Sequence, residues 1–144
     1  MIRKANRFDK LEILEMMTAF IKETGIEFLS KASNEEWRGE IFDSLTNGAG
    51  IIFIDPGKGC LVGYIAPSVW CNKTFGMYEM VWYVKPEHRD SRTGYKLYKK
   101  FEEYTEELKL LGRVSFVMMG EFKTRINYEK RGYKRMEKMW IKEA

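Results

Sequence analysis

The chain has 144 residues, of which 44% are hydrophobic and 32% charged, with 25 Lys and Arg against 21 Asp and Glu. This composition predicts one folded domain over 1–144 and excludes a disordered chain. A single histidine and two cysteines without ligand spacing exclude an ordinary zinc site, so we expect no metal. No run is apolar enough for a signal peptide or a membrane span, which predicts a soluble cytoplasmic protein without a membrane partner. Cys60 and Cys71 are then expected to be reduced, buried and inert.

The N-terminal third is predicted to hold one short strand and two helices. Residues 2–5 are the candidate strand, and a helix over 6–25 has Asn6 as its cap. Apolar residues at helical spacing in this helix are Phe8, Leu11, Leu14, Met17 and Ile21. A second helix over 33–48 begins with the capping box Ser33-x-x-Glu36.

The rest of the chain alternates strands with helices, which predicts an α/β or α+β sheet with helices on its faces. The expected elements are strands 50–55 and 60–67 as a hairpin, a strand 75–84, a helix from the following loop to about 111, a strand 113–119, a helix 123–132 and one or two strands over 133–142. The apolar stripe of the long helix is Leu97, Phe101, Tyr104, Leu108 and Leu111.

The segment over 83–98, YVKPEHRDSRTGYKLY, concentrates bases where this long helix begins, with Asp90 or Ser91 as its expected cap. The N-terminus of a helix is the positive end of its dipole, so bases there are unfavourable unless an anion lies nearby. Free backbone N–H groups at that point attract phosphate oxygens, and Gly94 would let a ligand approach the backbone closely. The segment therefore favours a phosphate-binding loop, with a solvated basic face as the alternative.

Residues 84–97, VKPEHRDSRTGYKL, resemble the acyl-CoA-binding signature of the GNAT N-acetyltransferases. In that signature a strand ending in V-x-P precedes Arg or Gln-x-x-Gly-x-Gly or Ala, and a helix follows. Arg89 matches the first position and Gly94 the last glycine, whereas Arg92 stands where the first glycine is usual. Residues 127–133, NYEKRGY, resemble the later Y-E-K-x-G-F segment of the family, and the expected element order matches over most of the chain.

The resemblance implies the GNAT fold, which has a mixed and mostly antiparallel sheet flanked by about four helices. The sheet would splay between the strands 75–84 and 113–119. Acetyl-CoA would be the co-substrate, with its pyrophosphate on the loop and its pantetheine arm along the open end of the first of these strands. The implied cofactor-binding residues are Tyr83, Val84, Arg89, Asp90, Ser91, Arg92, Thr93, Gly94, Tyr95 and Asn127.

Acetylation of an amine by direct transfer needs a base for the amine proton and an acid for the departing thiolate. Glu79 is the only charge in its apolar strand, and burial would raise its pKa toward neutrality, which suits a general base. The alternative is a carboxylate at a sheet edge or paired with a core Arg. The resemblance places Tyr128 near the CoA sulfur as the general acid, with a packing aromatic as the alternative.

These observations predict an acetyl-CoA-dependent N-acetyltransferase that acts on a primary amine. The alternative is a GNAT-fold module that binds CoA or a partner without catalysis, since Arg92 departs from the glycine that is usual in the signature. A homodimer is also compatible with the sequence. Interspersed acids and bases without an RNA- or DNA-binding signature argue against a nucleic-acid partner. Aromatic and acidic side chains would suit a cationic acceptor, whose identity stays open. They are Phe28, Trp37, Trp70 and Tyr83, with Glu23, Glu27, Glu35 and Glu36.

Overall fold

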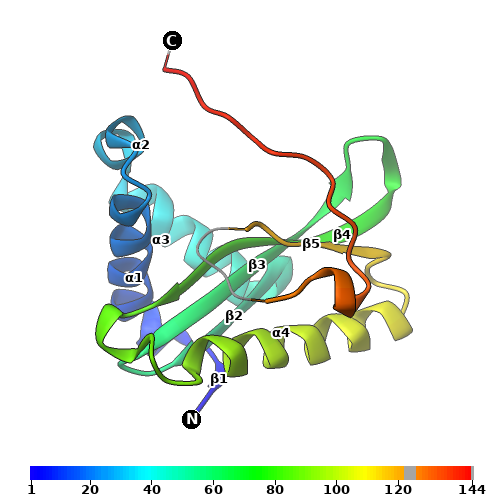
Figure 1. Cartoon of the computed structure of the whole chain (residues 1–144), viewed down its shortest axis with the longest axis horizontal. Coiled ribbons are helices and arrows are strands. Elements are labelled where there is room, and N and C mark those ends of the chain that lie inside the picture. The colour runs from blue at the N-terminus through cyan, green and yellow to red at the C-terminus, as the bar shows by residue number, and fades with distance from the viewer. Residues whose placement is uncertain (122–125, 144) are drawn as a thin grey trace.

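The computed structural model describes residues 1–121 and 126–143 (Figure 1). The helices are α1 (Lys10–Glu23), α2 (Glu27–Ala32), α3 (Glu35–Ser44) and α4 (Thr93–Leu110). The strands are β1 (Arg3–Lys4), β2 (Gly50–Asp55), β3 (Gly59–Ser68), β4 (Cys71–Val84) and β5 (Phe116–Met118). Side chains of α1 and α3 form one hydrophobic core against the sheet, and those of α4 form a second core on its other face. The expected mixed α/β architecture is therefore confirmed.

The five strands lie in the order β1-β2-β3-β4-β5. The first three pairings are antiparallel and the last, between β4 and β5, is parallel. The predicted hairpin of β2 and β3 is confirmed, and Gly57 in its turn has a positive φ of 78° that favours glycine. The sheet is thus mixed and mostly antiparallel, as the family resemblance implies.

Strand β4 has two irregularities that shape the site. Its pairing with β3 shifts at Val62/Gly63, where Val81 lies opposite Val62 but Glu79 lies opposite Gly63, so Met80 is an extra, bulged residue. Its pairing with β5 ends at Tyr78, opposite Met118, although β4 continues to Val84. Among the described residues, no strand pairs with this last part of β4 on the side where β5 lies. This separation of β4 from β5 is the splay that was predicted.

The helix boundaries differ in detail from the predicted ones. Asn6 does cap the first helical segment, where its side chain accepts from the Phe8 N–H at 2.9 Å. Helix α3 is capped by Asn34, which accepts from the Trp37 N–H at 2.9 Å, so the predicted capping box at Ser33 is wrong by one residue. The Ser33 hydroxyl accepts instead from the Arg38 guanidinium. Helix α2 was not predicted, because six residues are too few to show a period.

The predicted apolar stripes are only partly buried. In α1, Leu14 and Met17 are buried as expected, but Phe8 and Leu11 are 81% and 67% exposed. Ile13 and Met16 fill the core in their place, so the buried face of α1 is rotated from the predicted one. The stripe of α4 is confirmed at Leu97, Phe101 and Leu108, which are buried, and is wrong at Leu111, which is exposed.

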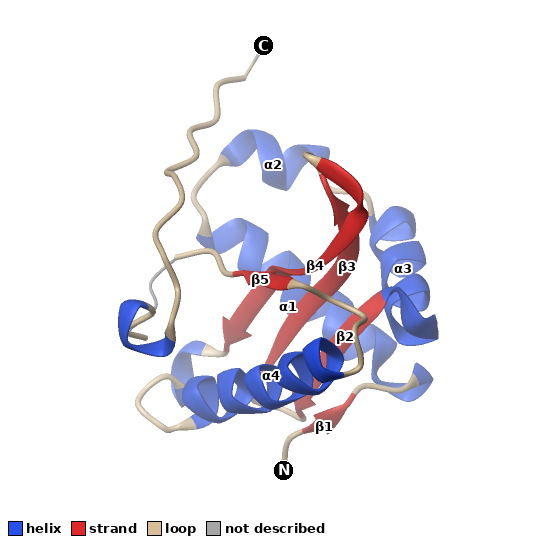
Figure 2. Cartoon of the chain, turned by 90° about the vertical axis from the view of Figure 1, so that its right-hand side faces the viewer, coloured by secondary structure: helices blue, strands red, loops and turns tan. Residues whose placement is uncertain are grey.

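The C-terminal part departs furthest from the expected elements. The predicted helix 123–132 lies partly outside the described residues, and its described end is one 3₁₀ turn (Glu129–Arg131) closed by Gly132. The predicted strands over 133–142 are wrong, because residues 133–143 form neither strand nor helix. In Figure 2 they run away from the sheet as a loop, without the neighbouring strand that a β-ladder requires.

The two cysteines have different environments. Cys60 is fully buried in β3, and burial raises the pKa of its thiol to about 12, as expected of an inert residue. Cys71 begins β4 at the tip of the β3–β4 hairpin and is exposed, so the prediction of two buried thiols is wrong there. Hydrogen bonds from Thr74 and the backbone lower the pKa of the Cys71 thiol.

Candidate functional site

The loop after β4 leaves backbone donors free at the start of α4. A 3₁₀ turn (Pro86–His88) follows the strand, and α4 begins at Thr93. Within the described residues, no acceptor is found for the backbone N–H groups of Asp90, Arg92, Gly94 and Tyr95. Neither Asp90 nor Ser91 caps α4 as predicted: Arg92 occupies the cap position, and the Ser91 hydroxyl accepts from the Thr93 N–H at 3.3 Å. Free N–H groups at a helix N-terminus form an anion site.

Arg92 takes the place of the usual glycine without backbone strain. Its φ of −89° and ψ of 10° lie where ordinary L-residues are found, so the loop does not need glycine there. The guanidinium lies over the Tyr95 ring, 5.4 Å from its centroid. No carboxylate of the described residues pairs with Arg92, Lys96 or Lys100. Arg92 and Lys96, at the helix start, are therefore available to an anion there, whereas Lys100 lies two turns further along α4.

Gly94 lies in the first turn of α4, beside the end of β4. A Cβ at this position would lie 3.5 Å from the Val84 side chain and 3.9 Å from Trp82 Nε1, which are ordinary contacts. The fold therefore tolerates a small side chain at Gly94. The absence of one leaves the free N–H groups open to a ligand, which agrees with the predicted phosphate loop.

Arg89 holds the loop rather than pointing into the anion site. Its guanidinium pairs with Glu23 at the end of α1, and its Nε donates to the Val84 carbonyl at 2.8 Å. The same group lies 5.6 Å from the centre of the Tyr83 ring. Arg89 therefore connects the loop to α1 and to β4. The sequence did not reveal this role for Glu23, because the two residues are 66 positions apart.

Glu79 is held on the α4 face of the sheet by the bulge that follows it. The register places it opposite Gly63, where Met77 and Phe101 pack so closely that a Cβ would lie 2.9 Å from the Met77 sulfur and 2.8 Å from the Phe101 ring. Burial raises the pKa of Glu79 to about 7. Among the described residues, the carboxylate has no ion-pair or hydrogen-bond partner, so the alternative of a structural pair with a core Arg finds no partner there.

Tyr128 meets Glu79 at Gly120, just beyond β5. The Tyr128 hydroxyl donates to the Gly120 carbonyl at 3.3 Å. A Cβ at Gly120 would lie 3.8 Å from Glu79 Oε1 and 3.9 Å from Oε2. The two predicted catalytic residues thus reach the same backbone position, at the mouth of the opening between β4 and β5. Gly120 was not identified from the sequence, although a glycine directly after a strand allows such close approach.

The remaining predicted residues come from the end of β4, the start of α4 and the position before Tyr128. Tyr83 is buried and Val84 half-buried at the end of β4, where the strand has no β5 partner. Thr93 is buried, and its hydroxyl lies 2.9 Å from that of Ser91. The Asn127 side chain accepts from the Lys130 N–H at 3.2 Å and so caps the short turn. This contact supplies a structural role for Asn127 beside the predicted one.

The residues predicted to suit a cationic acceptor do not all lie together, because Trp70 and Tyr83 are at opposite ends of β4. Glu23 is engaged by Arg89, and Trp70 is 85% exposed in the turn between β3 and β4. Trp37 on α3 is 61% exposed. Among the described residues, no group of three His, Cys, Asp or Glu side chains is placed to hold a metal, and no helix is long and apolar enough to cross a membrane.

Comparisons with known proteins match these features. The model of the acetyltransferase (GNAT) family matches residues 14–133. A GCN5-related N-acetyltransferase from Ralstonia eutropha JMP134 superposes with a TM-score of 0.72 at 18% identity, over 99% of this chain and 97% of that one. A predicted acetyltransferase from Clostridium acetobutylicum, solved with acetyl-CoA, superposes at 0.70 and 15% identity, over 100% and 95%. The comparison with curated proteins found no match.

The family match covers both segments that the sequence singled out, the loop before α4 and the turn at Tyr128. The structural neighbours share the whole fold at low identity, so their likeness concerns the fold alone. Free N–H groups, unpaired bases and an open strand edge are what a bound pyrophosphate and an extended arm require. The chain is thus a member of the GNAT acetyltransferase family.

Proposed function

We propose that this protein transfers the acetyl group of acetyl-CoA to a primary amine by direct transfer, with both substrates bound at once. The convergence of Glu79 and Tyr128 on Gly120, beside the open edge of β4, is the observation that supports the proposal most strongly. A carboxylate with a pKa of about 7 and a phenol then flank the place where a thioester laid along β4 would end.

The anion site supports binding of the pyrophosphate. The free N–H groups of Asp90, Arg92, Gly94 and Tyr95 would bond phosphate oxygens, and Arg92 and Lys96 would add charge. Successive residues of a strand turn their backbone groups to opposite sides, and Lys85 donates to Lys58 on the β3 side, so the backbone of Tyr83 also faces β3 and that of Val84 faces the open side. The Val84 N–H would bond the pantetheine arm as a neighbouring strand does, while the Val84 carbonyl accepts from Arg89. Asn127 would approach the arm from the opposite side of the opening.

The two side chains then divide the proton transfers. Glu79 accepts the proton that the amine loses as its nitrogen bonds to the acetyl carbonyl carbon. The C–S bond breaks, and Tyr128 donates its hydroxyl proton to the departing sulfur, which leaves as the thiol of CoA. Solvent then takes the proton from Glu79 and returns one to Tyr128, so the net products are the acetamide and CoA. Each transfer is typically worth roughly 10²–10⁴-fold in rate.

Binding and chemistry are tested separately. Acetyl-CoA at ~100 times its dissociation constant should add about 2.7 kcal/mol to the free energy of unfolding, measured by thermal melting, whereas an oligonucleotide at moderate salt should add nothing. A panel of polyamines, aminoglycosides and short peptides is then screened for release of CoA thiol. Stabilisation by the oligonucleotide but not by acetyl-CoA would refute the proposal. Stabilisation by acetyl-CoA without acetylation of any amine would favour a binding module without catalysis.

A further inference from the structure

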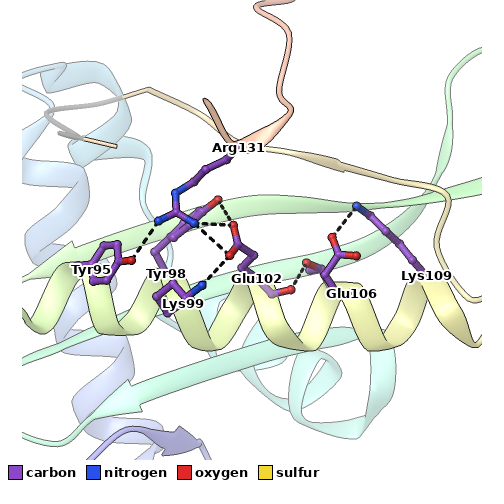
Figure 3. A network of polar contacts seen from close by, with 8 residues as sticks. Tyr95, Tyr98, Lys99, Glu102, Glu106, Lys109 and Arg131 are labelled. Carbon is purple, nitrogen blue, oxygen red and sulfur yellow. Dashed lines mark hydrogen bonds and ion pairs between the residues drawn. The ribbon is translucent and has the colours of Figure 1, made fainter. Parts of the chain in front are cut away.

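The guanidinium of Arg131 lies at the centre of a polar network on α4 (Figure 3). Its Nη1 donates to both carboxylate oxygens of Glu102 at 3.1 Å, and its Nη2 donates to the Tyr95 hydroxyl at 3.0 Å. Its Cζ lies 5.1 Å from the ring centre of Tyr98 and 5.6 Å from that of Tyr95. A planar group held by a carboxylate, a hydroxyl and two rings has a fixed orientation.

The carboxylate of Glu102 accepts hydrogen bonds from several side chains besides Arg131. It also accepts from the Tyr98 hydroxyl at 2.8 Å and from Lys99 Nζ at 3.0 Å. Burial tends to raise the pKa of Glu102, but the hydrogen bonds from Lys99, Tyr98 and Arg131 outweigh it and lower the pKa. The side chains of Glu102 and Arg131 are 23% and 26% exposed, so water screens their pairing less than it screens a pair at the open surface.

This network is attached directly to the turn that carries Tyr128. The Tyr128 carbonyl accepts from the backbone N–H groups of Arg131 and Tyr133, each at 3.0 Å. The Tyr128 ring meets the ring of Tyr98 edge to face, with centroids 6.4 Å apart. Tyr98 is fully buried on α4, so it offers the turn a fixed surface. The turn therefore touches α4 through the aromatic contact of Tyr128 with Tyr98 and through Arg131, which pairs with Glu102, bonds the Tyr95 hydroxyl and lies over both rings.

We infer that Arg131 and Glu102 are positioning residues, whose pairing fixes the turn at Tyr128 against α4 and thereby places the Tyr128 hydroxyl at Gly120. The inference rests on the proposed function, because it concerns the geometry of the proposed general acid. Neither residue is assigned a contact with the reacting atoms. Misplacement of a reacting group by about 1 Å can cost on the order of 10²-fold in rate, so loosening this turn should reduce turnover.

Glu102→Gln tests the inference, and Glu106→Gln one turn later is the matched control. Glu106 pairs with Lys109 on the same helix, away from Arg131. Glu102→Gln should speed amide hydrogen exchange over 126–133 and lower kcat by roughly 10–100-fold, with little change in KM for acetyl-CoA. Glu106→Gln should change none of these. Arg131→Gln should reproduce Glu102→Gln, and the two together should add little further loss.

A second combination separates positioning from general destabilisation. In a Tyr128→Phe background, Glu102→Gln should cause no further loss of kcat, because the hydroxyl being positioned is already absent. A further loss of the same size would overturn the inference, as would equal exchange over 126–133 in the Glu102 and Glu106 variants. Wild-type turnover in Tyr128→Phe alone would instead refute the general-acid role in the proposed function, and this inference with it.

Discussion

The guanidinium of Arg89 pairs with the carboxylate of Glu23, which lies 66 residues earlier as the last residue of α1. The same side chain donates to the carbonyl of Val84 at the end of β4. One residue of the loop between β4 and α4 therefore contacts both α1, on the opposite face of the sheet, and β4 in the sheet itself. The loop is held in place before any ligand binds.

The two contacts of Arg89 should differ in their worth to stability. Glu23→Gln weakens the partly exposed ion pair with Arg89, and an exposed pair of this kind contributes at most about 1 kcal/mol to the free energy of unfolding. Arg89→Ala also removes the bond to Val84 and the contact with Tyr83, so its loss should be larger. Urea denaturation at low and high salt measures both. An equal loss in the two variants would mean that the ion pair alone holds the loop.

Gly94 variants should separate folding from acetyl-CoA binding. Gly94→Ala fits the observed space and should raise stability by up to about 1 kcal/mol, because glycine is unfavourable within a helix. Gly94→Trp should abolish stabilisation by acetyl-CoA while the protein still melts cooperatively. Glu107→Trp, at an exposed position near the other end of α4, is the control and should bind acetyl-CoA normally. Unchanged binding by Gly94→Trp would place the anion site elsewhere.

Tyr128→Phe should reduce turnover without weakening acetyl-CoA binding. The substitution keeps the ring that packs on Tyr98 and Tyr133, and it removes the hydroxyl that bonds Gly120. Loss of a general acid should lower kcat by roughly 10²–10⁴-fold. Release of CoA thiol measures turnover, and thermal melting with acetyl-CoA measures binding. Full activity in the variant would leave Tyr128 with a packing role only.

The raised pKa of Glu79 should make the folded protein lose stability as pH rises. Below pH 4.5 the carboxyl is protonated in both states; between 4.5 and about 7 the unfolded chain has lost the proton and the folded chain still holds it. The cost grows across this window and is then constant at roughly 3 kcal/mol above pH 7. Glu79→Gln should therefore gain stability relative to wild type from pH 4 to pH 8. A constant difference across these pH values would contradict the raised pKa.

The same titration should appear in the rate. If Glu79 acts as the base, its deprotonated form is the active one, so kcat should rise through a pKa of about 7. Glu79→Gln should lose most activity near neutral pH and less at high pH, where more of the amine is already deprotonated in solution. A pH series with one acceptor measures this. Identical profiles for the two proteins would exclude Glu79 as the base.

Sequence patterns predicted the elements in which apolar residues repeat regularly over many positions or flank a clear turn. Leu97, Phe101 and Leu108 repeat over a long helix, and β2 and β3 flank a turn with glycine at positive φ, so both were predictable. Glu79 was visible as a charge in an apolar strand. The pairing of Arg89 with Glu23 was not visible, because local patterns carry no information about contacts between distant segments.

Other errors have equally local causes. Ser33 and Asn34 are both good helix caps, so the sequence could not choose between them. Strands were predicted over 133–142, but a strand also needs a neighbouring strand to pair with. The composition of a segment does not show whether such a neighbour is present. The meeting of Glu79 and Tyr128 at Gly120 depends on the register of β4 and could be found only in three dimensions.

The bulge at Met80 also sets where the opening lies along β4. A bulge bends its strand and increases the local twist, and here Met80 lies two residues after Tyr78, the last residue paired with β5. One surplus backbone residue thus marks the point where two neighbouring strands separate. Moving that surplus by two positions toward Val84 would turn Val81 and Trp82, which now pack on opposite faces of the sheet, each to the other face. The position of one surplus residue therefore decides which side chains at the end of β4 face α4 and which face α1.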